Sequence, residues 1–233
     1  MPEQIRCQKG FTLIEILIAM AISAIVMAAV VVLYRQQVRT QVTHQEVVKM
    51  EQNARAAMYY IERTLRMAGY NPTDSSTAGL AATFPGPPDI VACGGQATSN
   101  YLSFTTDDDA SGTVDVNDSE LLAFRLNGNR LERMSSGAVR WQLLIDNVDA
   151  MDFVYLDSTG ARITIPADIP IRTSRIQVTI VVRSSQTLPG AFLQINDTQN
   201  YTNQQGDIIL PAPNDGFRRL LLTCDVTCRN LNI

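Results

Sequence analysis

The hydrophobic positions of this chain follow three successive patterns. In the first, residues 11–33 are apolar almost throughout, and Glu15 is their only charged residue. About 20 apolar residues are enough to cross the core of a bilayer, so this segment predicts a membrane-spanning helix. Arg6 and Lys9 precede it, which favours a cytoplasmic N-terminus with the rest of the chain on the other side of the membrane.

The second pattern is amphipathic. Apolar residues recur at steps of three and four, which is the period of one helix face. No proline or glycine interrupts residues 11–68, whereas Gly69 and the Asn71-Pro72 pair form a strong stop signal. The sequence therefore predicts one continuous helix whose amphipathic half covers residues 34–69. The stripe that this half is expected to bury consists of Ala54, Met58, Ile61, Leu65 and Ala68.

The third pattern, over residues 70–233, is that of a β-rich globular domain. A proline-rich loop at residues 71–100 precedes short β-prone runs that are separated by turn signals. An antiparallel sheet built from these runs would supply the apolar surface that the helix stripe needs. The expected fold class is α+β, a long N-terminal helix packed on an antiparallel sheet. The predicted strands are residues 101–105, 120–126, 130–134, 139–145, 151–156, 162–165, 175–183 and 217–228.

Burial of the later strands can also be predicted. Within residues 175–183, apolar residues alternate with mostly polar ones, which predicts a strand that is buried on one face only. A turn at residues 158–160 is expected to join the strands on either side of it. Residues 184–216 contain three prolines and are expected to be mostly irregular.

Composition argues against two classes of function, nucleic-acid binding and catalysis. The chain has 233 residues, 45% of them hydrophobic and 18% charged, and a net charge of −4. This is enough apolar material for a folded domain, and no basic cluster indicates nucleic-acid binding. His44 is the only histidine, and it lies among polar residues of the predicted helix, where a solvated or packed residue is expected rather than a catalytic base. We therefore do not expect an enzyme.

The run Gly10-Phe11-Thr12-Leu13-Ile14-Glu15 resembles the processing site of type IV prepilins and of the related pseudopilins of type II secretion. The resemblance implies that prepilin peptidase removes residues 1–10 by cleaving after Gly10, and that Phe11 is then N-methylated. It also implies a pilin fold and an assembly role for Glu15, which would pair with the methylated N-terminal amine of a neighbouring subunit. From spacing alone, Glu15 could instead extend to the lipid headgroups.

Further segments are similar to minor pilins of the PilW type and to the J-type minor pseudopilins. They are residues 61–70, residues 144–160 and the terminal Arg229-Asn230. The resemblance implies a minor pilin that helps to initiate pilus assembly at or near the tip. Its expected partners are other minor pilins, the major pilin, prepilin peptidase and the inner-membrane assembly platform. It would be an inner-membrane protein with a periplasmic domain before it enters the pilus. A minor pseudopilin and a tip adhesin or uptake subunit are the alternatives.

Residues 107–118 resemble the calcium loop of an EF-hand. Oxygen-bearing side chains alternate in its first half, Gly112 occupies the sixth position and Asp118 the twelfth, where Glu120 could substitute. A solvated acidic hairpin loop would have the same composition. The candidate calcium ligands are Asp107, Asp109, Ser111, Thr113, Asp118 and Glu120.

Three cysteines, Cys93, Cys224 and Cys228, lie in the exported part, where disulfides persist. In an extended strand Cys224 and Cys228 would be about 13 Å apart, too far to bond each other. Cys93 would then pair with one of them. A tight turn at residues 225–227 would instead allow a Cys224–Cys228 disulfide.

Overall fold

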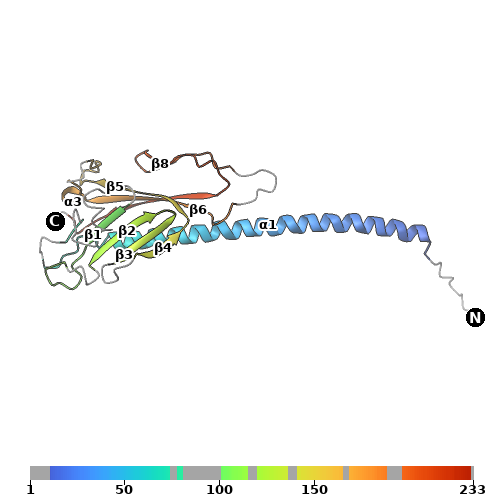
Figure 1. Cartoon of the computed structure of the whole chain (residues 1–233), viewed down its shortest axis with the longest axis horizontal. Coiled ribbons are helices and arrows are strands. Elements are labelled where there is room, and N and C mark those ends of the chain that lie inside the picture. Colours follow the sequence, from blue (N-terminus) through green and yellow to red (C-terminus); the bar gives the residue numbers. More distant parts are fainter. Residues whose placement is uncertain are drawn as a thin grey trace, which may run out of the picture. The chain divides into compact units, whose positions relative to one another are not determined.

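The computed structural model describes residues 11–73, 78–80, 101–114, 120–135, 141–164, 168–187 and 196–231. The chain divides into two compact units, residues 1–45 and residues 46–233, and each is described by itself. One long helix, α1 (Leu13–Leu65), contributes residues to both units. The predicted continuity of this helix is confirmed, because α1 is uninterrupted from its first residue to its last (Figure 1).

In the first unit, α1 carries the apolar segment. An 18-residue window of the helix has a mean hydropathy of 3.0, and none of that window is buried. Among the described residues, α1 is the one helix that is long and apolar enough to cross a membrane. The large apolar side chains from Phe11 to Leu33 are exposed. Such a surface is unfavourable in water, and its burial in lipid or against other helices would remove that cost.

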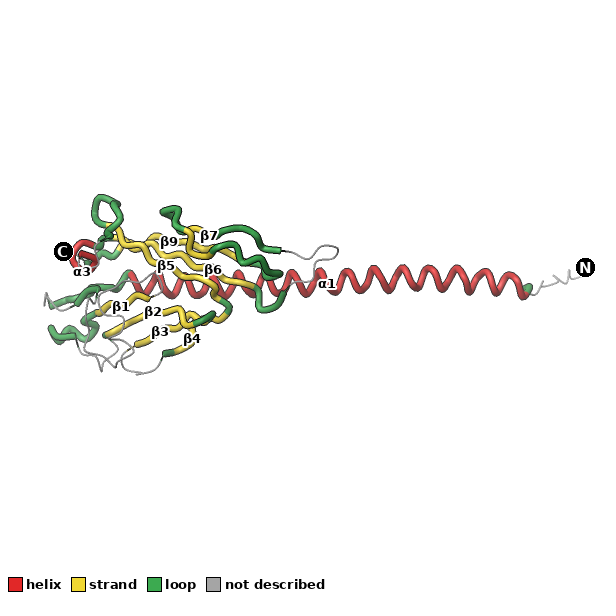
Figure 2. The backbone as a smooth tube through the Cα atoms, turned by 45° about the horizontal axis from the view of Figure 1, so that its top comes forward, coloured by secondary structure: helices red, strands yellow, loops and turns green. Residues whose placement is uncertain are grey.

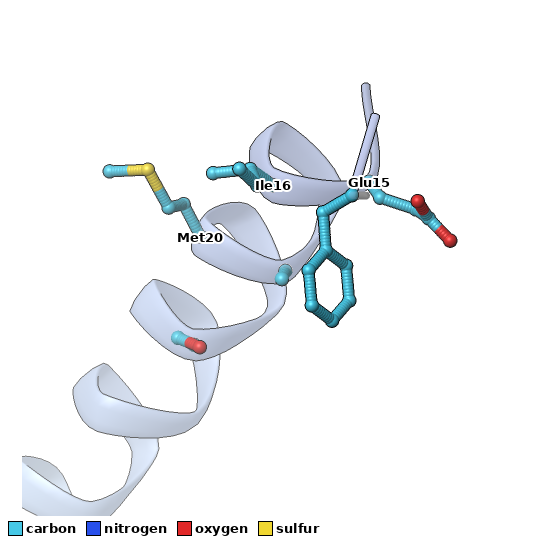
Figure 3. A pocket seen from close by; sticks show the side chains of 6 residues that line it. Glu15, Ile16 and Met20 are labelled. Carbon is cyan, nitrogen blue, oxygen red and sulfur yellow. The ribbon is translucent and has the colours of Figure 1, made fainter. Parts of the chain in front are cut away.

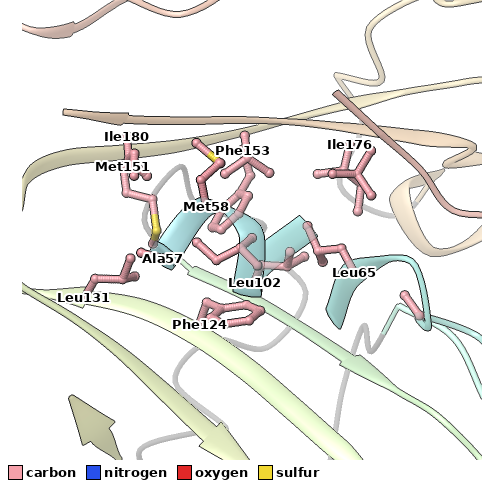
Figure 4. Close-up of a cluster of buried hydrophobic side chains, with 14 of the residues drawn as sticks. Ala57, Met58, Leu65, Leu102, Phe124, Leu131, Met151, Phe153, Ile176 and Ile180 are labelled. Atoms are coloured by element: carbon pink, nitrogen blue, oxygen red, sulfur yellow. The ribbon is translucent and has the colours of Figure 1, made fainter. Parts of the chain in front are cut away.

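In the second unit, residues 46–65 of α1 lie between two β-sheets (Figure 2). All five residues of the predicted stripe are buried. Figure 4 shows Ala57, Met58 and Leu65 between Phe124 and Leu131 of one sheet and side chains of the other sheet, such as Phe153. The amphipathic half of the helix is therefore the central layer of the domain core.

Both sheets are antiparallel. The first has the order β1-β2-β3-β4 and the second the order β5-β6-β9, while β7 and β8 form a separate pair. The first sheet consists of β1 (Tyr101–Thr105), β2 (Leu121–Asn127), β3 (Arg130–Ser135) and β4 (Gln142–Asp146). The remaining strands are β5 (Val148–Leu156), β6 (Arg175–Arg183), β7 (Tyr201–Thr202), β8 (Ile208–Leu210) and β9 (Arg219–Thr227).

Most predicted strands are confirmed, two of them, β1 and β6, with the predicted bounds. The strand predicted at residues 162–165 is wrong. Arg162 makes a single isolated bridge to Leu156, residues 163 and 164 do not continue it as a strand, and residue 165 lies outside the described residues. The short helix α3 (Ile169–Arg172) before β6 was not predicted.

The prediction that β6 is buried on one face only is also wrong. Gln177, Thr179 and Val181 alternate with the core residues, yet they too are buried. The reason is the segment around β7 and β8, where irregular structure was expected. Its Tyr201 packs on Val181, and its Gln205 donates a hydrogen bond to the Gln177 side chain. This segment covers the face of β6 that was expected to be in solvent.

Candidate functional site

The helix begins immediately after the expected cleavage site. Leu13 is the first helical residue, and Phe11 and Thr12 precede it in non-helical conformation. Phe11 is 85% exposed. Gly10 and the rest of the predicted leader lie outside the described residues. Phe11, on the carboxyl side of the expected scissile bond, therefore lies outside the helix and is accessible.

Glu15 takes part in a capping box at the start of α1. Its Oε2 accepts hydrogen bonds from the Thr12 amide at 3.1 Å and from the Thr12 hydroxyl at 3.0 Å. In return the Glu15 amide donates to the Thr12 hydroxyl oxygen at 3.3 Å. This reciprocal arrangement satisfies amide groups that the first helical turn leaves without partners. The carboxylate points away from the side chains of Ile16 and Met20 (Figure 3).

The sequence interpretation missed Thr12 as a functional residue. The signal was present, because Thr12 and Glu15 have the Thr-x-x-Glu spacing of a capping box before an apolar run. Glu15 consequently has a partner within its own helix. Because Phe11, Glu15 and Met20 border the same shallow apolar surface, the charge lies at the edge of the uncovered segment.

The acidic loop lies between β1 and β2, as the strand flanks predicted. One side-chain oxygen from each of Asp107, Asp109 and Glu120 lies within 4.8 Å of the others. Asp107 and Glu120 are buried, whereas Asp109 is exposed. The structure thus brings together three of the six candidate calcium ligands, among them the substitute Glu120. Asp118 lies outside the described residues.

Several of the candidate calcium ligands already form hydrogen bonds within the loop. The Asp107 carboxylate accepts hydrogen bonds from the amides of Ser111 and Gly112 at 3.0 Å each. The Ser111 amide also donates to Asp109, which holds the pKa of that carboxyl below its usual range. The Ser111 and Thr113 hydroxyls lie 3.3 Å from each other. The carboxylates fit a hard cation in chemistry, whereas these two hydroxyls are engaged with each other.

Two of the three candidate cysteines are described, and both are free thiols. The expected disulfide is therefore not supported. A Cys224–Cys228 bond is wrong because β9 stays extended through Thr227, and Cys93 lies outside the described residues. The Cys228 Sγ instead lies 3.6 Å from the Leu65 carbonyl oxygen. Burial raises the pKa of Cys224 to about 11 and that of Cys228 to about 12, so both are protonated at neutral pH.

Comparison with known proteins assigns the chain to a family. The prokaryotic N-terminal methylation motif matches residues 5–31, which include the capping box and the predicted cleavage site. The family of prepilin peptidase-dependent protein B matches residues 43–199. Among solved structures, type IV-like pilin TTHA1219 from Thermus thermophilus is similar, with 14% sequence identity and a TM-score of 0.49, over 78% of this chain and 98% of that chain. A search of curated proteins returns no match.

The predicted membership of the prepilin family is confirmed by the methylation motif, whose match includes residues 10–15. The second match extends over more than half of the chain, from the amphipathic part of α1 to the segment before β7. The chain therefore belongs to the prepilin peptidase-dependent protein B family and is a type IV pilin-like protein that prepilin peptidase processes.

Proposed function

We propose that this chain is a minor pilin that helps to initiate type IV pilus assembly and is incorporated at or near the pilus tip. Prepilin peptidase cleaves after Gly10, and Phe11 becomes the methylated N-terminus. The observation that carries the proposal is the exposed apolar part of α1, with one carboxylate at its start, inside a matched methylation motif. Its partners are other minor pilins, the major pilin and the inner-membrane assembly platform.

The proposed assembly step is the pairing of two opposite charges. Cleavage creates a positive amine on Phe11, and α1 places Glu15 one turn further along the helix. A carboxylate buried among apolar helices is costly when alone and is stabilised by an opposite charge. Pairing of Glu15 with the amine of the neighbouring subunit would therefore select one axial register among otherwise apolar helices. The N-terminus would be cytoplasmic and the β domain periplasmic before assembly.

The capping box allows the charge of Glu15 to be tested apart from its role at the helix start. Glutamine at this position can still accept the hydrogen bonds of Thr12 but carries no charge. We expect Glu15→Gln to be cleaved like the wild type yet to enter sheared pili at least about tenfold less well, because a lost buried ion pair is worth several kcal/mol. Cleavage is read from the mobility of the membrane-bound protein and incorporation from pull-down of the pili.

Two further variants distinguish the pairing role of Glu15 from its role as a helix cap. Glu15→Ala removes both the charge and the cap, and it should be no worse than Glu15→Gln if the charge is what matters. Thr12→Ala keeps the carboxylate but removes the hydroxyl that caps the helix, at a cost of about 1 kcal/mol. Normal incorporation of Glu15→Gln together with failure of Glu15→Ala would assign Glu15 to capping and contradict the pairing role.

A minor pseudopilin would have the same N-terminal segment and the same processing. Gene neighbourhood and a deletion strain discriminate the two roles. Loss of surface pili with processed major pilin retained in the membrane supports the minor pilin. Normal pili with a defect in protein secretion would instead assign the chain to a secretion system.

A second proposal concerns the acidic loop, and the convergence of Asp107, Asp109 and Glu120 supports it. We propose that these carboxylates bind calcium, which prefers six to eight oxygen ligands. Calcium is expected to raise the melting temperature of the full chain in detergent, and a chelator to reverse the shift. Asp109→Asn should abolish the shift by removing a ligand.

Asp108 provides the matched control for the calcium test. It lies in the same loop and is exposed, but it is not one of the three convergent carboxylates. Asp108→Asn removes the same unit of charge and should leave the calcium-dependent shift intact. Equal loss in both variants would indicate general electrostatic screening, and no shift in the wild type would remove the proposal.

A further inference from the structure

Within the described residues, strand β9 has one edge that pairs with no other strand. It is the last strand of its sheet, and its nine residues pair with β6 without any register shift. Just beyond the two ends of this pairing, the Cys228 amide donates to the Ser174 carbonyl at 3.0 Å and the Ser184 amide to the Arg218 carbonyl at 2.8 Å. These bonds place the even-numbered residues of β9 in the hydrogen-bonded pairs of the ladder. The amides and carbonyls of the odd-numbered residues therefore point away from β6.

The exposed part of this edge extends over residues 221–227. Leu221, Thr223, Asp225 and Thr227 are exposed, and no hydrogen bond from the described part of the chain reaches their outward amides and carbonyls. Natural edge strands are usually protected from other chains by lysine, proline or bulges. β9 contains none of these, and Asp225 is its one exposed charge, because the Arg219 side chain is only 2% exposed.

A polar cavity of about 380 Å³ lies at the end of this edge. It is lined by Arg66, just after α1, by Asp225 and Thr227 of β9, and by Arg229. Two of these charges already have partners: Arg66 pairs with Glu62, and Asp225 faces Arg175 at 3.6 Å. Arg229 makes no ion pair with any described residue. The cavity therefore presents the Arg229 guanidinium, which forms no ion pair within the described part of the chain, next to Thr227, and a guanidinium and a hydroxyl are complementary to a carboxylate.

We propose that β9 binds an extended, acidic segment of a neighbouring pilin subunit by strand addition. The segment's main chain pairs with the outward amides and carbonyls of Leu221, Thr223 and Asp225, and its carboxylate enters the Arg229 cavity. In this mode the backbone bonds give affinity and the side-chain pocket gives specificity. A phosphate would use the guanidiniums but not the alternating donors and acceptors of the edge, so the geometry favours a peptide.

The inference rests on the proposed function only for the source of the segment. Binding is measured with purified full-length protein in detergent, by fluorescence anisotropy of a labelled peptide Thr-Val-Thr-Val-Thr-Glu with blocked ends. The same peptide ending in glutamine is expected to bind about tenfold more weakly, because it lacks the charge. This assay does not depend on pili, so its outcome is independent of the incorporation test on Glu15.

Variants of β9 identify the mode of binding. Thr223→Pro removes one outward amide and leaves the hydrogen bonds between β9 and β6 in place. It should lower the affinity for the peptide by at least about tenfold. Thr223→Ala keeps the amide and should bind like the wild type. Arg229→Gln should abolish the preference for glutamate over glutamine, and Arg229→Lys should restore part of it. Circular dichroism verifies that each variant is folded.

Other outcomes would overturn the proposal. Equal binding to folded Thr223→Pro and Thr223→Ala would rule out strand addition. Equal affinity of the wild type for the two peptides would rule out carboxylate recognition in the cavity. Binding of labelled oligothymidylate without binding of either peptide would indicate that the ligand is a nucleic acid and not an acidic segment of a protein. Binding of none of the probes would show that β9 does not have this role.

Discussion

Replacing Gly69 by alanine is expected to destabilise the β domain by about 2–5 kcal/mol. Gly69 has a φ of +76°, and a Cβ built there would lie 2.7 Å from the Asn230 carbonyl oxygen and 2.7 Å from a methyl group of Leu231. Its amide donates to the Thr105 carbonyl at 3.0 Å, so it cannot simply move away. The melting temperature of the full chain, followed by fluorescence of the single tryptophan, should fall by about 5–15 °C.

Gly128 is the matched control for this prediction. It also has a positive φ, +60°, but a Cβ there would meet no atom within 4 Å. Gly128→Ala should therefore destabilise the domain only by the cost of placing alanine in a left-handed backbone conformation, about 1–2 kcal/mol, because no steric clash is added. Losses of similar size in the two variants would show that the close approach of residues 230 and 231 does not matter.

Replacing Arg219 by methionine is expected to cost about 3–5 kcal/mol. The guanidinium, in a side chain that is 2% exposed, pairs with Asp149 at 2.7 Å, Asp197 at 3.1 Å and Asp215 at 2.7 Å. Asp149 and Asp197 are themselves largely buried, with side chains 7% and 9% exposed. Asp149 would keep its ion pair with Arg183 at 3.2 Å, whereas Asp197 would lose the one cation with which it pairs among the described residues. The network also fastens the segment that covers the outer face of β6, so that segment should become accessible to protease first.

Two comparisons test the origin of this loss. Arg175→Met breaks an ion pair whose side chains are 44% and 37% exposed, and it should cost at most about 1 kcal/mol. Arg219 holds the pKa of Asp215 below its usual range, so the stabilisation from this pair is present above the unfolded pKa near 4 and is lost as pH falls through the lowered value. The difference between wild type and Arg219→Met should shrink on acidification. A difference that is independent of pH would indicate lost packing instead.

The candidate site at the N-terminus was predictable because its parts are close in sequence. Gly10, Phe11 and Glu15 fall within one short run, and the Thr12 capping signal lies in the same run. The acidic cluster was predicted less well. Glu120 joins Asp107 and Asp109 because β2 begins at Leu121 and returns antiparallel to β1, and this register is set by pairing across the sheet.

The helix and most strands were predictable for a related reason. A helix face requires apolar residues at steps of three and four, and the Ala54–Ala68 stripe is buried as that period indicates. The terminal strand likewise directs Leu220, Leu222 and Cys224 to the core, because alternate residues of a strand lie on the same face. Periodicity does not show what covers the other face. Val181 is buried because Tyr201, from a separate segment, packs on it.

By itself, the sequence determined the processing motif, the uninterrupted helix, its buried stripe and the α+β class, since each depends on residues within a few turns or one strand of one another. Tertiary structure alone decided which carboxylates converge, which glycine has no room for a side chain, which arginine neutralises three aspartates and which edge of β9 stays open. These features depend on contacts between segments far apart in the chain. Such contacts are set by how the helix and the two sheets pack, which no local pattern encodes.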